Sequence, residues 1–165
     1  METDDSIYFY GHSKGDFTFM SNFYPCDFVD EEGNNFNCSE QYFMYMKAKT
    51  FEPDNEDLLN LILLETTPSK VKKYGRMVKN YDDKIWNEIR FNIMIDALRL
   101  KFNQNEYLKE KLLTTENKTL YEAAKNDKIW GIGMDASKAL ITNKNKYGRN
   151  LLGRGLMIIR EELRE

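Results

Sequence analysis

The sequence has a single histidine and only two cysteines among its 165 residues. Cys26 and Cys38 are too few for a disulfide framework, and they lack the spacing of a zinc site. A metal site built from several histidines is excluded, and a Ser-His-Asp or Cys-His apparatus would depend on His12 alone. Any catalysis is therefore expected to use carboxylates, lysine, arginine and tyrosine, with no metal and no cofactor.

Long hydrophobic runs are also missing. No apolar stretch approaches the roughly 20 residues of a membrane-spanning helix, and no basic-then-apolar leader follows Met1. The length, with 41% hydrophobic and 31% charged residues, is typical of one globular domain over residues 1–165. We therefore expect an intracellular monomer without a membrane partner, located in the cytoplasm or, in a eukaryote, also in the nucleus.

A strong positive charge is absent as well. The net charge is −3 and the pI is near 5.4, so the surface as a whole does not predict nucleic-acid binding. Lysines and arginines gather locally in residues 70–79 and 138–154. Either group can hold a phosphate, or can simply be a solvated face.

The apolar patterns predict an α+β fold that is predominantly helical, with a small antiparallel sheet formed mainly by the N-terminal part. Residues 7–10 are β-prone, and 28–37 resemble a hairpin with a glycine in its turn. Residues 119–124 favour a strand, and the polar residues 134–147 favour a mobile surface loop. A helix is expected at the C-terminus, and five more are expected before it, over residues 39–47, 58–63, 68–78, 82–104 and 107–113.

Residues 39–47 organise this interpretation. Ser39 is expected to cap a helix that is apolar nearly all round and hence buried. Glu40 and Lys47 are about two turns apart, so they share one face with Phe43 and Met44. Two interpretations are open: both can belong to structural charge networks, or they can be a catalytic acid and a lysine whose burial frees a neutral amine.

Seven motifs in a fixed order resemble the NADAR family, also called YbiA-like N-glycosidases. The resemblance spans nearly the whole chain, from about Phe9 to Leu163. Its pieces are residues 19–24, 39–47, 75–76, 86–102, 122–127, 130–133 and 150–160.

The resemblance implies hydrolysis of the N-glycosidic bond between ribose C1 and a base or base-like ring. One branch of the family acts on phosphoribosylamino-pyrimidine intermediates of riboflavin synthesis, and another removes ADP-ribose from guanine in nucleic acid. Residues 39–42 are Ser-Glu-Gln-Tyr, whereas the riboflavin branch usually has Ser-Glu-His-Tyr. This detail favours ADP-ribosylated guanosine as the substrate; the riboflavin intermediate and a non-catalytic ADP-ribose-binding module are the alternatives.

The resemblance also assigns roles to residues. Glu40 is expected to be the principal acid/base, Lys47 to attack C1 or stabilise the leaving group, and Asp127 to orient a ribose hydroxyl or share proton transfer, unless it only caps its loop. An oxocarbenium-like transition state makes such carboxylates useful. The expected substrate-binding residues are Ser21, Asn22, Phe23, Tyr42, Arg76, Trp86, Trp130, Gly131, Gly133 and Asn150, with Arg76 and the two glycines contacting phosphates.

Overall fold

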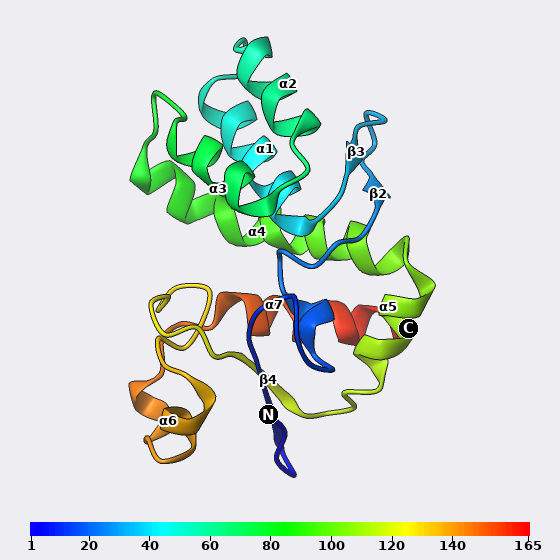
Figure 1. The fold of residues 1–165 in the computed structure, drawn as a ribbon, viewed down its shortest axis with the longest axis vertical. Helices are drawn as coiled ribbons and strands as arrows, with labels where there is room; N and C mark the ends of the chain where they lie inside the picture. The colour runs from blue at the N-terminus through cyan, green and yellow to red at the C-terminus, as the bar shows by residue number, and fades with distance from the viewer. The chain divides into compact units, whose positions relative to one another are not determined.

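The computed structural model describes residues 1–165, and the chain divides into two compact units (Figure 1). The terminal unit comprises Met1–Ser21 with Glu106–Glu165, and the central unit comprises Asn22–Asn105. The predicted α+β, predominantly helical class is confirmed, with seven α-helices and two small sheets. No helix combines the length and the apolar character that crossing a membrane requires.

The central unit is built around one buried helix. Helix α1 (Ser39–Phe51) contacts three other helices and the hairpin. The first seven residues of α1, Ser39–Tyr45, are all buried, so the prediction of a helix that is buried all round is confirmed there. The elements packed around α1 are the antiparallel strands β2 (Phe28–Val29) and β3 (Asn35–Phe36), and helices α2 (Glu56–Leu64), α3 (Pro68–Arg76) and α4 (Asp83–Asn103).

The start of α1 differs from the prediction. Cys38, with an extended backbone, is the N-cap, and Ser39 is already inside the helix with its Oγ atom buried and without a hydrogen-bond partner. The expectation that Ser39 caps the helix is therefore wrong. The N–H of Glu40 donates instead to the backbone oxygen of Asn22 over 3.0 Å. Since a loop carbonyl satisfies this first-turn donor, a side-chain cap is not needed there.

A glycine lets α3 approach α1 closely. A Cβ atom at Gly75 would overlap the Sδ atom of Met44 on α1. The contact places the C-terminal end of α3, which carries Arg76, against the helix of Glu40 and Lys47.

Helix α4 buries a slightly different face from the one expected. Helical spacing predicts a buried apolar stripe that begins with Ile85, Trp86, Ile89 and Ile93. The Ile85 side chain is 46% exposed, however, whereas Trp86 is buried. Two cations lie within the buried face: Arg90 is 8% exposed and Lys101 is 0% exposed. Apolar periodicity located the helix correctly and missed the charges that it buries.

The terminal unit contains a parallel strand pair. β1 (Ser6–Phe9) pairs with β4 (Thr119–Glu122) in parallel, with Ile7 opposite Leu120. The strand predicted at 119–124 is therefore confirmed, but β1 does not join the antiparallel hairpin of the central unit. Helix α7 (Leu151–Glu162) packs on β4.

The segment at 134–147 contains short helical turns that were not predicted. They are helix α6 (Ala136–Leu140), capped by the Asp135 side chain, and a 3-10 turn, η2 (Lys144–Lys146), capped by Asn143. Apolar periodicity does not reveal them because their polar caps define them, and the mobility of the segment stays a prediction. The remaining elements are η1 (Thr18–Met20) and α5 (Glu106–Leu113).

Candidate functional site

Helix α1 presents two opposite faces. At 100° per residue, Glu40, Phe43 and Lys47 project to one side, and Tyr42 and Lys49 project to the other. Both faces are largely buried, so burial alone does not identify the functional one. The groups around each face decide between them.

Lys47 lies against an aromatic surface. Its Nζ atom is 4.8 Å from the centroid of the Tyr81 ring and 5.9 Å from that of Trp86. The ammonium makes no hydrogen bond or ion pair with another residue. Burial lowers the pKa of Lys47, Arg76 lowers it further, and Glu40 partly opposes both effects. The side chain therefore offers a neutral amine at lower pH than an exposed lysine does.

The aromatic surface beneath Lys47 is part of the core. The Trp86 ring lies 5.0 Å from Phe43 and 6.2 Å from Phe51, and Phe51 lies 5.3 Å from Tyr81. These centroid distances are those of favourable aromatic pairs. Trp86 is buried and is thus mainly a core residue, although its ring also borders the amine of Lys47.

Glu40 and Asn22 meet at the first turn of α1. The Glu40 side chain is only 7% exposed, and its charge acts on Lys47. The Asn22 side-chain oxygen is buried and accepts no hydrogen bond within the chain. Because an unsatisfied buried acceptor is costly, this oxygen is suited to receive a donor such as a hydroxyl of a bound molecule.

Arg76 and Arg90 add positive charge. Arg76 is exposed, forms no ion pair, and lies near enough to act on the pKa of Lys47. Arg90 is buried on α4, one turn after Trp86, and its charge acts on Tyr81. The Arg90 Nε atom has no hydrogen-bond partner, and no carboxylate pairs with this guanidinium. A cation buried in this way typically costs several kcal/mol unless an anion joins it.

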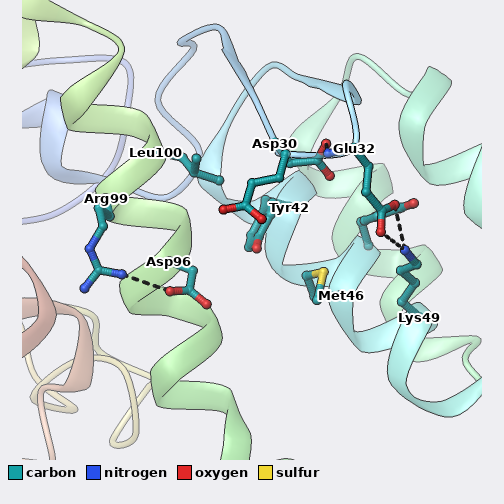
Figure 2. Close-up of a pocket in the computed structure, with 10 residues that line it drawn as sticks. Asp30, Glu32, Tyr42, Met46, Lys49, Asp96, Arg99 and Leu100 are labelled. Carbon is teal, nitrogen blue, oxygen red and sulfur yellow. Dashed lines mark hydrogen bonds and ion pairs between the residues drawn. The ribbon is translucent and has the colours of Figure 1, made fainter.

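Tyr42 belongs to the other face of α1. Its ring packs against Phe28 and Phe36, and it lines a pocket of about 350 Å³, which Figure 2 shows. The charged side chains lining this pocket are Asp30, Glu31, Glu32, Asp96, Lys49 and Arg99. Four carboxylates against two cations disfavour an anionic ligand. The structure therefore places Tyr42 apart from the Lys47 cluster, contrary to the expected grouping.

The side chain of Gln41 joins two helices. Its Oε1 accepts from the N–H of Asn37 at 2.7 Å, and its Nε2 donates to the carbonyls of Ile62, Leu63 and Glu65 at 3.0–3.1 Å. The side chain is 1% exposed. Gln41 thus fixes the end of α2 to the start of α1, and these hydrogen bonds occupy both ends of its side-chain amide.

In the terminal unit, Asp127 shapes a loop. Its Oδ1 atom accepts from the N–H groups of Ile129 at 2.9 Å and Trp130 at 2.8 Å. This is the loop-capping role that the sequence allowed. Asp127 remains half-buried, and its participation in proton transfer stays a prediction.

The same loop holds the two glycines. Carbonyls of residues 128–131 accept from the N–H groups of residues 149–152, which fixes the loop to the start of α7. The N–H groups of Gly131 and Gly133 donate no hydrogen bond within the chain, and Gly133 has a φ of +76°. Two free amides in a fixed loop are compatible with the expected phosphate contact.

Asn150 has a mainly structural position. Its Nδ2 donates to the Leu120 carbonyl at 2.8 Å, and its Oδ1 accepts from the Glu122 N–H at 3.0 Å. The backbone is left-handed there, with φ of 52°. Because its amide is committed to β4, substrate binding by Asn150 stays a prediction that the geometry does not favour.

A family model described as the NADAR domain matches residues 8–164, across both units. The chain belongs to the NADAR family. It is 40% identical to N-glycosidase R617 of Acanthamoeba polyphaga mimivirus over 98% of each chain. The NMR structure of the E. coli protein YbiA superposes with a TM-score of 0.77 at 30% identity, over 99% of this chain and 88% of that chain.

A third relative is longer. A riboflavin biosynthesis protein of Vibrio vulnificus is 32% identical over 98% of this chain, which spans 40% of that protein. The matches to proteins named N-glycosidases cover nearly the whole chain, so this NADAR protein is an N-glycosidase.

The structure brings together some of the residues expected from the NADAR motifs. In the central unit, Glu40, Lys47, Arg76 and Trp86 form one cluster. Asn22 adjoins it through the Glu40 N–H, and Phe23 follows in the chain with Lys72 Nζ 5.9 Å from its ring. The other expected residues, except Tyr42, belong to the terminal unit. Ser21 lies at the end of its first segment, and one loop region contains Asp127, Trp130, Gly131, Gly133 and Asn150.

Sequence reasoning missed Tyr81 and Arg90. Tyr81 lies in the polar segment before α4, where no periodicity marks it. Arg90 did leave a signal, because it stands four residues after Trp86 and three before Ile93, inside the apolar stripe. A charged residue within such a stripe is worth inspecting as a site residue.

Proposed function

We propose that this N-glycosidase cleaves the bond between ribose C1 and the base nitrogen of ADP-ribosylated guanine, in nucleic acid or free guanosine. The observation that carries the proposal is Lys47, whose amine faces two aromatic rings without an ion-pair partner while Glu40 acts on it. A nucleophilic amine and an adjacent carboxyl group are the two groups that this cleavage needs.

The proposed reaction proceeds through the opened sugar. The C1–O4 bond of the ribose breaks first, O4 takes up a proton, and C1 becomes doubly bonded to the guanine nitrogen. The neutral amine of Lys47 adds to C1, which returns this double bond to a single bond, and the lysine nitrogen loses a proton. The carbon–nitrogen bond to guanine then breaks as Glu40 delivers a proton to the departing nitrogen, and C1 is held as a Schiff base on Lys47. Water adds to C1, the carboxylate of Glu40 assists the proton transfers, and the free sugar aldehyde and the amine are regenerated.

The charges of the site support a phosphorylated substrate. Arg76 has no ion-pair partner and can bind a phosphate with two parallel hydrogen bonds. ADP-ribose carries a pyrophosphate, which such a guanidinium can bind. The family motifs favour the ADP-ribose branch of the family. Gln41 supports this choice only as a feature of the sequence, because its side chain makes structural hydrogen bonds.

The riboflavin-branch substrate is the second candidate. It is favoured by the Vibrio vulnificus relative, whose name assigns it to riboflavin biosynthesis. A phosphoribosylamino-pyrimidine carries the same ribosyl–nitrogen bond and a phosphate on the same ribose. The Lys47 and Glu40 chemistry is compatible with either compound.

A direct substrate comparison tests the proposal. The protein is incubated separately with ADP-ribosylated guanosine DNA and with the phosphoribosylamino-pyrimidine, and release of the sugar is followed for each. Faster release from the DNA, by at least about tenfold in kcat/KM, supports the proposal. Preference for the pyrimidine would transfer the function to the second candidate.

The Glu40→Gln variant tests whether the site works by catalysis or only by binding. The amide cannot transfer the proton, so turnover should disappear while ADP-ribose affinity is largely retained. A pure binding module would show no turnover before the substitution and little change in affinity after it.

A further inference from the structure

Arg90 is a buried charged group of the central unit without an ion-pair partner. Its guanidinium is buried on α4, its Nε has no hydrogen-bond partner, and no carboxylate pairs with it. Arginine stays protonated in proteins, so this charge cannot be removed by deprotonation. Its charge acts on Tyr81, whose hydroxyl donates to Asp83, and neither Asp83 nor Asp82 forms an ion pair with Arg90.

We propose that Arg90 binds the phosphate attached to C5 of the ribose whose C1 bond is cleaved. This inference rests on the proposed function only in that the substrate is a 5-phosphorylated ribosyl compound. Both candidate substrates meet that condition, since ADP-ribose has its pyrophosphate at this carbon and the pyrimidine intermediate has a phosphate there.

The position of Arg90 suits this role. It follows Trp86 by one turn on the buried side of α4, and Trp86 borders the amine expected to react at C1. Tyr81, whose ring lies under the same amine, is within the electrostatic reach of Arg90. The guanidinium offers paired donors to a phosphate, and a buried setting strengthens each of them.

Exposed Arg76 differs from Arg90 in what it can select. Arg76 adds charge at the edge of the cluster, where solvent screens it. Arg90 is buried, and its paired N–H groups can bind two oxygens of one phosphate in a single orientation. This contact also fixes the position of the attached ribose. The specificity for a 5-phosphorylated sugar is therefore assigned to Arg90.

Calorimetry with ribose 5-phosphate and with ribose tests the assignment without any turnover. The wild-type protein should bind the phosphorylated sugar at least about tenfold more tightly. Arg90→Met, which removes the charge and keeps an apolar side chain, should abolish that preference. Arg90→Lys should retain only part of it, because an ammonium lacks the paired donors. Lys84→Met is the matched control, since it removes one exposed positive charge from the same helix and should leave the preference intact.

Thermal unfolding separates binding from a structural role. Because Arg90 has no internal partner, Arg90→Met should unfold at the same temperature as the wild type or higher. A lower unfolding temperature together with an unchanged preference for ribose 5-phosphate would overturn the inference. If Arg90→Met does not fold, the lysine variant decides: full affinity for ribose 5-phosphate in Arg90→Lys would also overturn it. Failure of the protein to cleave ADP-ribosylated guanine would refute the proposed function and leave these binding results as they are.

Discussion

Replacing Lys47 gives the sharpest test of the mechanism. Lys47→Ala removes the amine and most of the stem, Lys47→Met keeps an apolar chain against the Tyr81 and Trp86 rings, and Lys47→Arg keeps a positive charge there. Arginine cannot supply a neutral amine at working pH. The three variants therefore separate packing, charge and nucleophilicity at one position.

The expected losses follow from the surroundings of Lys47. The amine has cation–π contacts but no hydrogen bond or ion pair, so Lys47→Met should change the free energy of unfolding by no more than about 1 kcal/mol. Its loss as a nucleophile should slow turnover by at least about 100-fold in all three variants, which is about 2.7 kcal/mol in the activation free energy. A catalytic loss well above the stability loss marks a chemical role.

Single-turnover release of the base measures this effect, and borohydride reduction of the mixture should trap the sugar on Lys47 in the wild type alone. If Lys47→Arg kept turnover within about tenfold of wild type, the side chain would act through its charge. Repeated failure to trap an adduct would point the same way, and the Schiff-base step would then have to be abandoned.

Three further predictions concern charge and structure. Arg76→Gln removes a cation that lowers the pKa of Lys47, so the alkaline rise of the pH–rate profile should move to higher pH; an unmoved profile would exclude Arg76 as a neighbour of the reacting amine. Burial lowers the pKa of Lys101 from 10.5 to about 8, so the unfolded chain binds more protons between these values. In urea unfolding, the free energy of unfolding of the wild type should therefore rise by up to about 3 kcal/mol relative to that of Lys101→Met as the pH increases from 8 to 10.5. Asn150→Ala leaves two backbone groups of β4 without their hydrogen-bond partner and puts alanine at a left-handed backbone position. The free energy of unfolding should fall by about 2–4 kcal/mol in the same measurement. A loss below about 1 kcal/mol would contradict the structural role of Asn150.

Local patterns predicted the central unit well. The spacing of Glu40 and Lys47 placed both on one face because side-chain direction repeats along any helix. The hairpin followed from the glycine-containing turn between two short β-prone segments. In both cases the determining interaction lies within a few turns of chain.

Other features depend on groups that are distant in the sequence. β1 pairs with β4 from the other end of the chain, and no local pattern states which strand it will meet. The Ser39 cap was replaced by a carbonyl from the preceding loop at Asn22. Tyr42 was grouped with Glu40 by its motif, although the helix turns it to the opposite side.

The two faces of α1 show how an acidic chain can carry out the proposed reaction on an anionic substrate. The net charge is −3, but the carboxylates near α1 gather in the pocket that contains Tyr42 (Figure 2). The opposite face carries Lys47, with Arg76 and Arg90 beside it and Glu40 as its buried acid. In the proposed reaction, a phosphorylated sugar is repelled from one face and attracted to the other, so the charge arrangement selects the side on which Lys47 lies. The uncompensated positive charge at this face is disfavoured, and the phosphate proposed to bind Arg90 relieves it.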